Sequence, residues 1–190
     1  MFYFIEGISG AGKSTYLELI WRDVDKIIEG DLIKPQPFCD GKRISLDDYK
    51  EQHIRQLRLL SDIKSQNVAI MGGLLHTIEY DLIGIYDFGK QQIIQYIEEI
   101  ILFVPENSRI IYLETTDIAN NFKTVLEERY LSRPDWIRGL FDYLNRTAYC
   151  QTMGWKGEDG AIKLMEMIYE CDKDILSKIH IDKKIITRKI

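Results

Sequence analysis

The sequence has few cysteines and histidines, and this scarcity limits the chemistry it can carry out. Its 190 residues include three of each, and all six lie far apart. Cys39, Cys150 and Cys171 form no C-x-x-C pair, so a zinc site is not expected. An odd number of separated thiols is typical of free cysteines in a reducing cytoplasm. The histidines are likewise too scattered to suggest a metal cluster.

Long apolar runs and an excess of positive charge are also missing. The most apolar stretch, residues 93–104, contains Gln95, Glu98 and Glu99, so no membrane span is expected. The net charge is −5, with acidic and basic residues interspersed. General nucleic-acid binding requires a basic face, so we expect no nucleic-acid partner, whereas a nucleotide requires only a local positive site. A strand begins at the first residues and leaves no room for a signal peptide, so we expect a cytoplasmic protein.

The patterning predicts one α/β domain spanning residues 1–190. A hydrophobic content of 45% is enough for one full core. Apolar strand-like runs alternate with amphipathic helices, which indicates a three-layer fold with a five-stranded parallel sheet and helices on both faces. The expected strands cover residues 1–5, 26–29, 67–71, 109–113 and 184–187.

The segments between these strands are expected to be mostly helical. Ser45 resembles the start of a capping box and predicts a helix to about Lys64. Two segments have no helical period: residues 32–42, which contain Pro35, Pro37 and Gly41, are expected to be irregular, and residues 74–89 to be loop and short helix. The other expected helices cover residues 14–21, 90–104, 117–129, 135–149 and 161–175.

One glycine-rich stretch carries the main functional signal. Residues 7–15 read G-x-x-x-x-G-K-S-T, directly after the first expected strand and at the start of the first expected helix. Strand, glycine loop and helix in this order indicate a phosphate-binding loop, the P-loop or Walker A motif. Glycines allow positive φ and close approach of the backbone, so successive N–H groups can point at phosphate oxygens.

This motif predicts binding of ATP with Mg²⁺. Lys13 is expected to reach the β- and γ-phosphates, and the Ser14 hydroxyl to bind the metal ion. The helix N-terminus adds its dipole and unpaired donors behind the phosphates. The predicted nucleotide-binding residues are Gly7, Ser9, Gly10, Ala11, Gly12, Lys13, Ser14 and Thr15.

The residues from Phe4 to Thr15 resemble the opening of thymidylate kinases, and the order of elements is similar to that of the nucleoside and nucleotide kinase group of P-loop proteins. The resemblance implies a sheet with the P-loop strand at its centre. It also implies an acceptor pocket on one side of the loop and a mobile, arginine-bearing lid on the other. The matching lid segment lies at residues 129–136, where a helix from the fourth strand is interrupted before Pro134.

The sequence departs from thymidylate kinases at the end of the third strand. Those kinases carry an Asp-Arg pair there, whereas this strand ends Met71-Gly72-Gly73. Since ligands sit at the carboxyl ends of parallel strands, Asp31 and Glu29 at the end of the second strand are the expected substitutes, as base or as ligand of metal-bound water. Glu6 is expected to make a structural contact within the loop.

The lid segment offers two arginines as catalytic candidates. Arg133 lies in the interruption itself and is the better candidate, and Arg129 lies just before it. A lid arginine stabilises the charge spread over the transferred phosphoryl group. The alternative is that Arg129 forms a surface ion pair with Glu128 or Asp135.

Together these features predict a P-loop kinase that transfers phosphate from ATP to a small molecule. The acceptor pocket is expected between residues 33–38 and 74–86, which are compatible with a nucleoside, nucleotide, sugar or antibiotic alcohol. The missing Asp-Arg pair leaves an alternative: a regulatory protein that binds or hydrolyses nucleotide on a kinase scaffold. The sequence does not fix the oligomeric state.

Overall fold

The computed structural model describes residues 1–20, 22, 24–29 and 33–188. Within these ranges five parallel strands form one sheet in the order β2-β5-β1-β6-β7. The strand that leads into the glycine loop is therefore central, and the predicted fold class is confirmed. In order across the sheet, the strands are β2 (Lys26–Glu29), β5 (Val68–Met71), β1 (Phe2–Glu6), β6 (Ser108–Thr115) and β7 (Asp182–Arg188).

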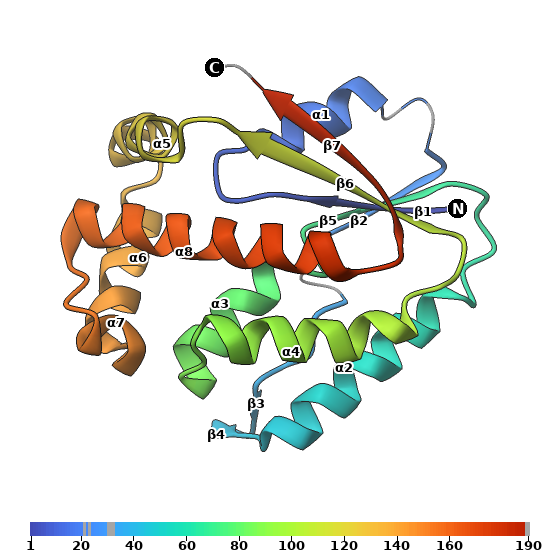
Figure 1. Cartoon of the computed structure of the whole chain (residues 1–190), viewed down its shortest axis with the longest axis horizontal. Coiled ribbons are helices and arrows are strands. Elements are labelled where there is room, and N and C mark those ends of the chain that lie inside the picture. Colours follow the sequence, from blue (N-terminus) through green and yellow to red (C-terminus); the bar gives the residue numbers. More distant parts are fainter. Residues whose placement is uncertain (21, 23, 30–32, 189–190) are drawn as a thin grey trace.

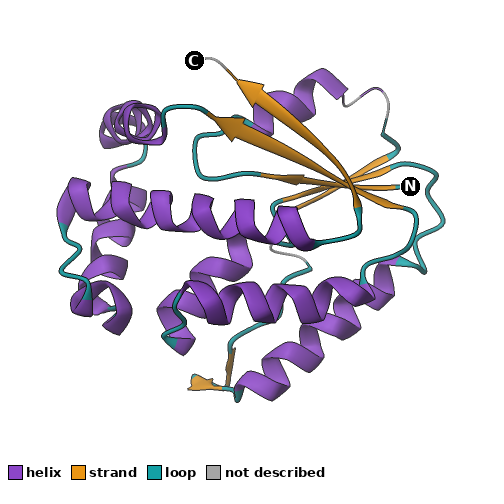
Figure 2. Ribbon diagram, in the orientation of Figure 1, coloured by secondary structure: helices purple, strands orange, loops and turns teal. Residues whose placement is uncertain are grey.

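Helices cover both faces of this sheet, as Figures 1 and 2 show. One face is covered by α1, and the other by α2, α4 and α8. The helices α5 and α6 lie at the end of the molecule toward which β6 and β7 point (Figure 1). The bounds are α1 (Lys13–Ile20), α2 (Leu46–Leu60), α3 (His76–Tyr86), α4 (Lys90–Ile100), the 3₁₀ turn η3 (Ile101–Phe103), α5 (Ile118–Ser132), α6 (Pro134–Arg146), α7 (Ala148–Thr152) and α8 (Gly157–Lys178).

The sheet is buried because its central strands are apolar on both faces. Phe4 and Ile5, which point to opposite faces of β1, are both fully buried. Ile70 on β5 and Ile110 on β6 pair with Phe4 and are fully buried as well. A nearly continuous apolar run is typical of a parallel strand covered by helices on both sides. Because β1 is buried in this way between β5 and β6, the glycine loop that follows it starts at the middle of the carboxyl edge of the sheet.

The expected capping of α2 is present. The Ser45 side chain accepts a hydrogen bond from the Asp48 backbone N–H at 3.1 Å, and its hydroxyl donates to the Asp48 carboxylate at 2.6 Å. These contacts satisfy a donor that the first helical turn leaves unpaired. The helix ends at Leu60 rather than near Lys64, because Leu57 and Leu60 are the last residues of its buried face.

Two segments are more regular than the sequence predicts. Within residues 32–42, the described part contains a short hairpin, β3 (Phe38–Cys39) and β4 (Lys42–Arg43). Asp40 and Gly41 have positive φ values of 50° and 73°, which suit a two-residue hairpin turn.

The expectation of loop and short helix at residues 74–89 is also wrong, because α3 runs for 11 residues there. Its amphipathic pattern is weak because Glu79 is buried along with Ile78, Leu82 and Ile83. A carboxyl group on the buried face disguises the helical period of the apolar residues.

The interruption between α5 and α6 is narrower than expected. The helix α5 continues to Ser132 and α6 begins at Pro134, so Arg133 alone lies outside helical geometry, with φ −146° and ψ 63°. Proline suits the first position of a helix, because its missing N–H would have no partner there. The chain therefore changes direction at one residue.

Candidate functional site

The glycine loop between β1 and α1 adopts the compact form that its composition predicts. Gly7, Gly10 and Gly12 have φ values of 136°, 86° and 84°. A Cβ on Gly7 would lie 2.6 Å from the backbone oxygen of Leu113 on β6. The loop can close against the sheet only without a side chain at this position.

Replacing Gly7 with alanine is therefore expected to destabilise the protein strongly. Strain at positive φ and the clash with the Leu113 carbonyl together predict a loss of roughly 2–5 kcal/mol in the free energy of unfolding. Urea denaturation followed by circular dichroism would measure it. Gly41→Ala is the matched control: φ is 73°, but a Cβ there meets no heavy atom within 4 Å. It should lose only about 1 kcal/mol, and equal losses in the two variants would contradict the argument.

Lys13 folds back over the loop. Its ammonium group donates to the carbonyl oxygens of Gly7 at 2.5 Å and Ile8 at 3.1 Å. Its Cε lies 3.8 Å from the position that a Cβ on Gly72 would occupy. Burial lowers the pKa of Lys13 to about 8, although the negative charges of Glu6 and Asp172 oppose this shift. The group is placed to meet a phosphate at the mouth of the loop.

Ser14 is exposed at the start of α1, and its side chain fits the predicted metal role. Its hydroxyl makes a long contact of 3.7 Å with the Met71 sulfur at the end of β5. Sulfur is a weak acceptor, so this contact can be exchanged for a metal ion at little cost. Two consecutive residues thus supply an ammonium group and a hydroxyl group at the carboxyl edge of the sheet.

One face of α5 packs directly on the loop. Asn121, Val125 and Arg129 are spaced one helical turn apart and therefore share this face. A Cβ on Gly10 would lie 2.4 Å from Cγ2 of Val125 and 3.3 Å from Nδ2 of Asn121. Among the described residues, the buried Nδ2 of Asn121 has no hydrogen-bond partner. A donor in this position is available to a ligand of the loop.

Arg129 extends this face by one turn. Its guanidinium stacks 3.9 Å from the centre of the Trp136 ring, instead of forming the surface ion pair considered from the sequence. It shares the face of α5 that carries Asn121 and Val125, and its positive charge contributes to lowering the pKa of both Lys13 and His76. Arg133 is exposed at the junction of α5 and α6.

Three carboxyl groups from distant parts of the chain are buried near Lys13. Glu6 lies at the end of β1, Glu79 on α3 and Asp172 on α8, and all three are fully buried. Glu6 accepts hydrogen bonds from the backbone N–H groups of Leu74 at 2.8 Å and His76 at 3.4 Å. The expected structural role of Glu6 thus extends to holding the loop between β5 and α3.

Glu79 and Asp172 influence each other's protonation. Burial and the charge of Asp172 raise the pKa of Glu79 well above its usual value, and burial raises the pKa of Asp172 to about 8. The Tyr112 hydroxyl donates to Oδ2 of Asp172 at 2.8 Å, whereas Oδ1 of Asp172 and both oxygens of Glu79 have no hydrogen-bond partner among the described residues. Protonation of these carboxyl groups removes the cost of two buried like charges.

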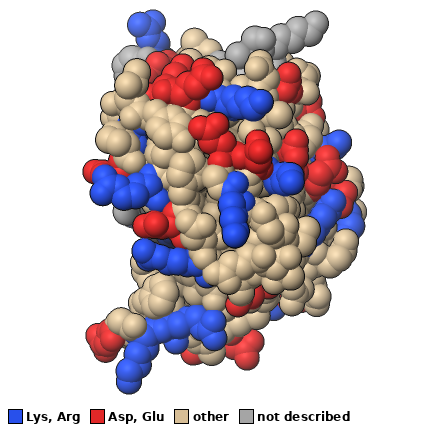
Figure 3. All heavy atoms as spheres, turned by 90° about the vertical axis from the view of Figure 1, so that its left-hand side faces the viewer, with Lys and Arg blue, Asp and Glu red and all other residues tan. Residues whose placement is uncertain are grey.

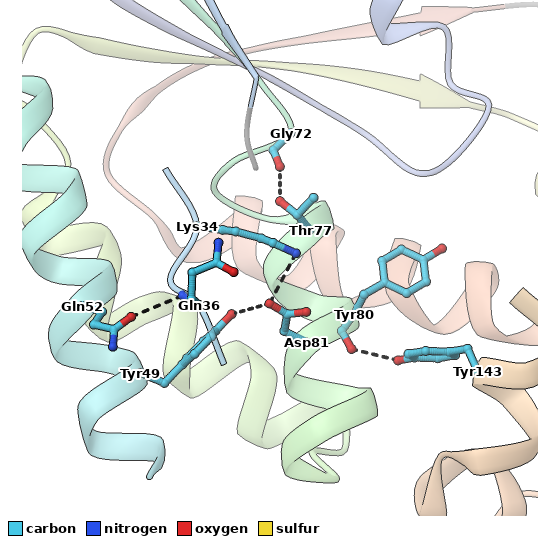
Figure 4. Close-up of polar contacts among 9 residues, drawn as sticks. All are labelled: Lys34, Gln36, Tyr49, Gln52, Gly72, Thr77, Tyr80, Asp81 and Tyr143. Carbon is cyan, nitrogen blue, oxygen red and sulfur yellow. Dashed lines mark hydrogen bonds and ion pairs between the residues drawn. The ribbon is translucent and has the colours of Figure 1, made fainter. Parts of the chain in front are cut away.

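The end of β5 confirms that no Asp-Arg pair is present there. Gly72 has a φ of 69° and receives a hydrogen bond from Thr77, drawn in Figure 4. Of the expected substitutes, Glu29 ends β2, and its backbone pairs with Met71 at the same edge of the sheet. Asp31 and the side chain of Glu29 lie outside the described residues.

The two segments expected to form the acceptor pocket do come together. The ammonium group of Lys34 lies 3.6 Å from the carboxylate of Asp81 on α3. Tyr49 on α2 donates to the same carboxylate at 2.9 Å. Figure 4 shows these side chains below Gly72 and Thr77, with Gln36 bonded to Gln52 beside them.

On the other side of α3, His76 borders the loop. Its Nε2 lies 3.2 Å from the Ser9 hydroxyl oxygen. Burial and the charges of Lys13 and Arg129 keep the pKa of His76 well below its usual value, so the ring is neutral near pH 7. His76 and Ser9 both line a hollow of about 330 Å³ between α3 and α6. A wider hollow of about 590 Å³ lies at the opposite end of the sheet, where β6 and β7 begin.

The surface around the site carries mixed charge. The end of the molecule with α5 and α6 shows interspersed basic and acidic side chains and broad neutral areas (Figure 3). In the described ranges, no helix is long and apolar enough to cross a membrane, and no group of three or more His, Cys, Asp or Glu side chains is arranged to hold a metal ion. Cys39, Cys150 and Cys171 are free.

A glycine loop closed by lysine, at the centre of a parallel sheet of this strand order, defines a P-loop fold. The solved structures that this chain resembles include thymidylate, shikimate and gluconate kinases. The activities named belong to those proteins. No family model matches, and no curated protein matches either.

Three of these structures indicate the degree of likeness. The YorR protein of Bacillus subtilis, in complex with phosphorylated GDP, is 17% identical with a TM-score of 0.49, over 98% of this chain and 85% of that one. The thymidylate kinase of Candida albicans is 15% identical with a TM-score of 0.47, over 100% and 84%. A gluconokinase from Sinorhizobium meliloti is 14% identical with a TM-score of 0.45, over 98% and 83%.

Several residues near the loop had no distinct sequence signal. Glu79 and Asp172 look like ordinary helical surface acids, and Asn121 like an exposed polar residue. Asp81 could have been noticed as a polar residue within an apolar stretch, and Lys34 as a cation within the proline-containing segment. Their assembly depends on contacts between elements far apart in the sequence.

Proposed function

We propose that this protein is an ATP- and Mg²⁺-dependent phosphotransferase of the P-loop kinase type that acts on a small molecule in the cytoplasm. The observation that carries the proposal is the arrangement around Lys13. Three features lie together at one edge of the sheet: the glycine loop, the face of α5 that carries Arg129, and the hollow that Ser9 helps to line.

The loop residues would hold the nucleotide. The backbone from Gly7 to Thr15 and the Lys13 ammonium group would bind the phosphates, and the Ser14 hydroxyl would bind Mg²⁺. The metal ion, when bound, neutralises charge on the β- and γ-phosphates. Exchange of the two carbonyl contacts of Lys13 for phosphate contacts requires only a rotation of its flexible side chain.

Residues 129–136 would act as the lid of a single domain. Arg129 already faces the loop, and Arg133 at the junction can approach it if α6 moves. Either guanidinium would stabilise charge on the transferred phosphoryl group. Asp31 or Glu29 would orient the acceptor hydroxyl or hold metal-bound water; Glu29 is the last residue of β2, and Asp31 follows two residues later in the sequence.

A regulatory protein that binds or hydrolyses nucleotide is the second candidate. The observation that favours it is the Gly72-Gly73 end of β5, where no acid is present to orient an acceptor. In this case the loop and the lid would respond to nucleotide without transferring phosphate to a second substrate.

An ADP-release screen with purified protein, Mg²⁺ and ATP separates the two candidates. The panel should contain nucleosides, nucleotides, sugars and other alcohols, with free phosphate measured in parallel. ADP formation that depends on one acceptor, without matching phosphate release, supports the kinase. Phosphate release that is equal with and without acceptors, or nucleotide binding without turnover, supports the regulator.

Nucleotide affinity is expected to fall as the pH rises above 8. The pKa of Lys13 is about 8 in the free protein, and bound phosphates would raise it. Below pH 8 the lysine is already charged and binding takes up no proton. Above pH 8 binding must take up one, so affinity should weaken by up to about tenfold per pH unit.

Calorimetric titration with a non-hydrolysable ATP analogue at pH 7, 8 and 9 would measure this dependence. Buffers of different ionisation enthalpy would report proton uptake at pH 9 and almost none at pH 7. Asp172 titrates in the same range, so Asp172→Asn is the control. It should retain the dependence, displaced toward lower pH because the charge of Asp172 raises the pKa of Lys13. An affinity that is constant from pH 7 to 9 would show that Lys13 does not bind the phosphates.

A further inference from the structure

The hollow beside the P-loop is lined by uncharged side chains, although phosphoryl transfer involves charged groups. It holds about 330 Å³ between α3 and α6, and none of its lining residues is acidic, lysine or arginine. Ring side chains make up most of the lining, which consists of Ser9, His76, Tyr80, Trp136, Gly139, Leu140 and Tyr143.

The rings that line the hollow are held in place. Tyr143 donates its hydroxyl to the backbone oxygen of Tyr80 at 2.9 Å, a contact that Figure 4 shows. The two rings meet edge to face with centres 5.7 Å apart, and His76 meets Tyr80 in the same way at 5.1 Å. A Cβ on Gly84 would lie 2.4 Å from the Tyr143 ring, so glycine is required for α6 to approach α3 this closely.

These contacts also decide what the hollow offers to a ligand. The Tyr143 hydroxyl is engaged with the backbone, and the Tyr80 hydroxyl lies 3.4 Å from the Met165 sulfur. The walls therefore present ring surfaces, while the polar contact between Ser9 and His76 marks the end nearest the P-loop. Such walls suit a flat, uncharged group, and stacking on aromatic side chains accepts different ring systems.

The volume of the hollow also limits which ligands it can hold. Small-molecule pockets hold roughly 300–1,000 Å³, so this one is at the lower end. It can take a single ring system, with the remainder of the molecule outside. A phosphate group inside it would lose its water without meeting a cation among the lining residues, because Arg129 stacks on the Trp136 ring and is not itself part of the lining.

We propose that this hollow binds a planar, uncharged ring of the acceptor, as in a nucleoside, with the reacting hydroxyl directed toward Ser9 and the P-loop. This inference rests on the proposed kinase function and narrows the acceptor to ring-bearing alcohols. The polar group formed by Lys34, Asp81 and Tyr49 lies on the other side of α3 and is outside this subsite (Figure 4).

Gly139 provides a direct way to close the hollow. It is an exposed residue within α6 that lines the hollow, and a Cβ there meets no heavy atom within 4 Å. Gly139→Leu should therefore fill the hollow without disturbing the core, and Gly139→Ala is the matched control that adds only one methyl group. Both residues favour a helix more than glycine does, so the melting temperature should not fall in either variant.

The experiment is calorimetric binding of adenosine, guanosine, cytidine and thymidine to each protein in the presence of Mg²⁺ and a non-hydrolysable ATP analogue. Ribose and glucose serve as alcohols without a planar ring. We expect at least one nucleoside to bind the wild type and Gly139→Ala with similar affinity, and to bind Gly139→Leu at least tenfold more weakly. The ATP analogue should bind all three proteins equally.

Three results would overturn this inference: no nucleoside binds, nucleoside binding survives in Gly139→Leu, or the sugars bind as well as the nucleosides. Failure of the proposed function looks different, because the ATP analogue itself then does not bind or acceptor-dependent ADP formation is absent. If ADP forms with an acceptor while Gly139→Leu retains full activity, the kinase proposal stands and the ring subsite is refuted.

Discussion

Replacing Lys13 with alanine is expected to abolish the thermal stabilisation that Mg²⁺ and a non-hydrolysable ATP analogue give to the wild-type protein. At a ligand concentration about 100 times the dissociation constant, binding stabilises a protein by about 2.7 kcal/mol, and the variant should lose nearly all of this. The reason is that the Lys13 ammonium group lies on the carbonyl oxygens of Gly7 and Ile8, at the mouth of the loop.

The fold itself is expected to survive this change, since Lys13 packs on Gly72 with only part of its side chain. Melting curves recorded without nucleotide would establish this. Lys123→Ala, which removes an exposed charge from the outer side of α5, is the matched control and should retain the full ligand-induced shift. Equal shifts in wild type and Lys13→Ala would refute the assignment of the loop.

The second large effect is expected at Arg129. Arg129→Ala should lower turnover by a factor on the order of 10³ while the affinity for the ATP analogue changes only a few-fold. An arginine that contacts the transferred phosphoryl group acts mainly in the transition state and is worth about 10³–10⁵ in rate. Its position on the face of α5 that contacts Gly10 makes it the stronger of the two lid candidates.

Steady-state kinetics with the acceptor identified in the ADP-release screen would provide the comparison. Arg133→Ala is the companion variant, because this exposed residue lies at the junction and outside the face that packs on the loop. Arg129→Lys keeps the charge and tests whether the planar guanidinium is needed. A large loss in Arg133→Ala together with a small loss in Arg129→Ala would reverse the ranking.

The parts of the fold that depend on neighbouring residues could be predicted from the sequence. The P-loop has glycine where positive φ is required, the Ser45 cap lies three residues before its partner Asp48, and Pro134 follows the interruption between two helices. Each of these depends on backbone geometry or on contacts within a few residues. The β-branched strands and their alternation with helices likewise indicated the parallel sheet.

The sequence-based prediction fails in segments where the local sequence pattern disagrees with the way the segment packs in the folded protein. The helix α3 was missed because its buried face includes a carboxyl group, Glu79, which lies among apolar residues beside Asp172 of α8. The two lid candidates depend on the same kind of tertiary contact. Arg133 lies in the interruption, whereas Arg129 shares the face of α5 on which Val125 packs against Gly10, and the kinetic comparison tests which of them acts.

By itself, then, the sequence determined the conformation of the loop and the class of the fold, because glycine conformation, capping and strand patterning are encoded in short stretches of chain. Only the tertiary structure decided which distant groups surround Lys13. Glu6, Glu79 and Asp172 come from β1, α3 and α8. In the hollow beside the loop, Tyr80 also comes from α3, whereas Tyr143 comes from α6. Their contacts, charges and protonation depend on a shared interior of low dielectric constant, which exists only after the helices have packed on the sheet.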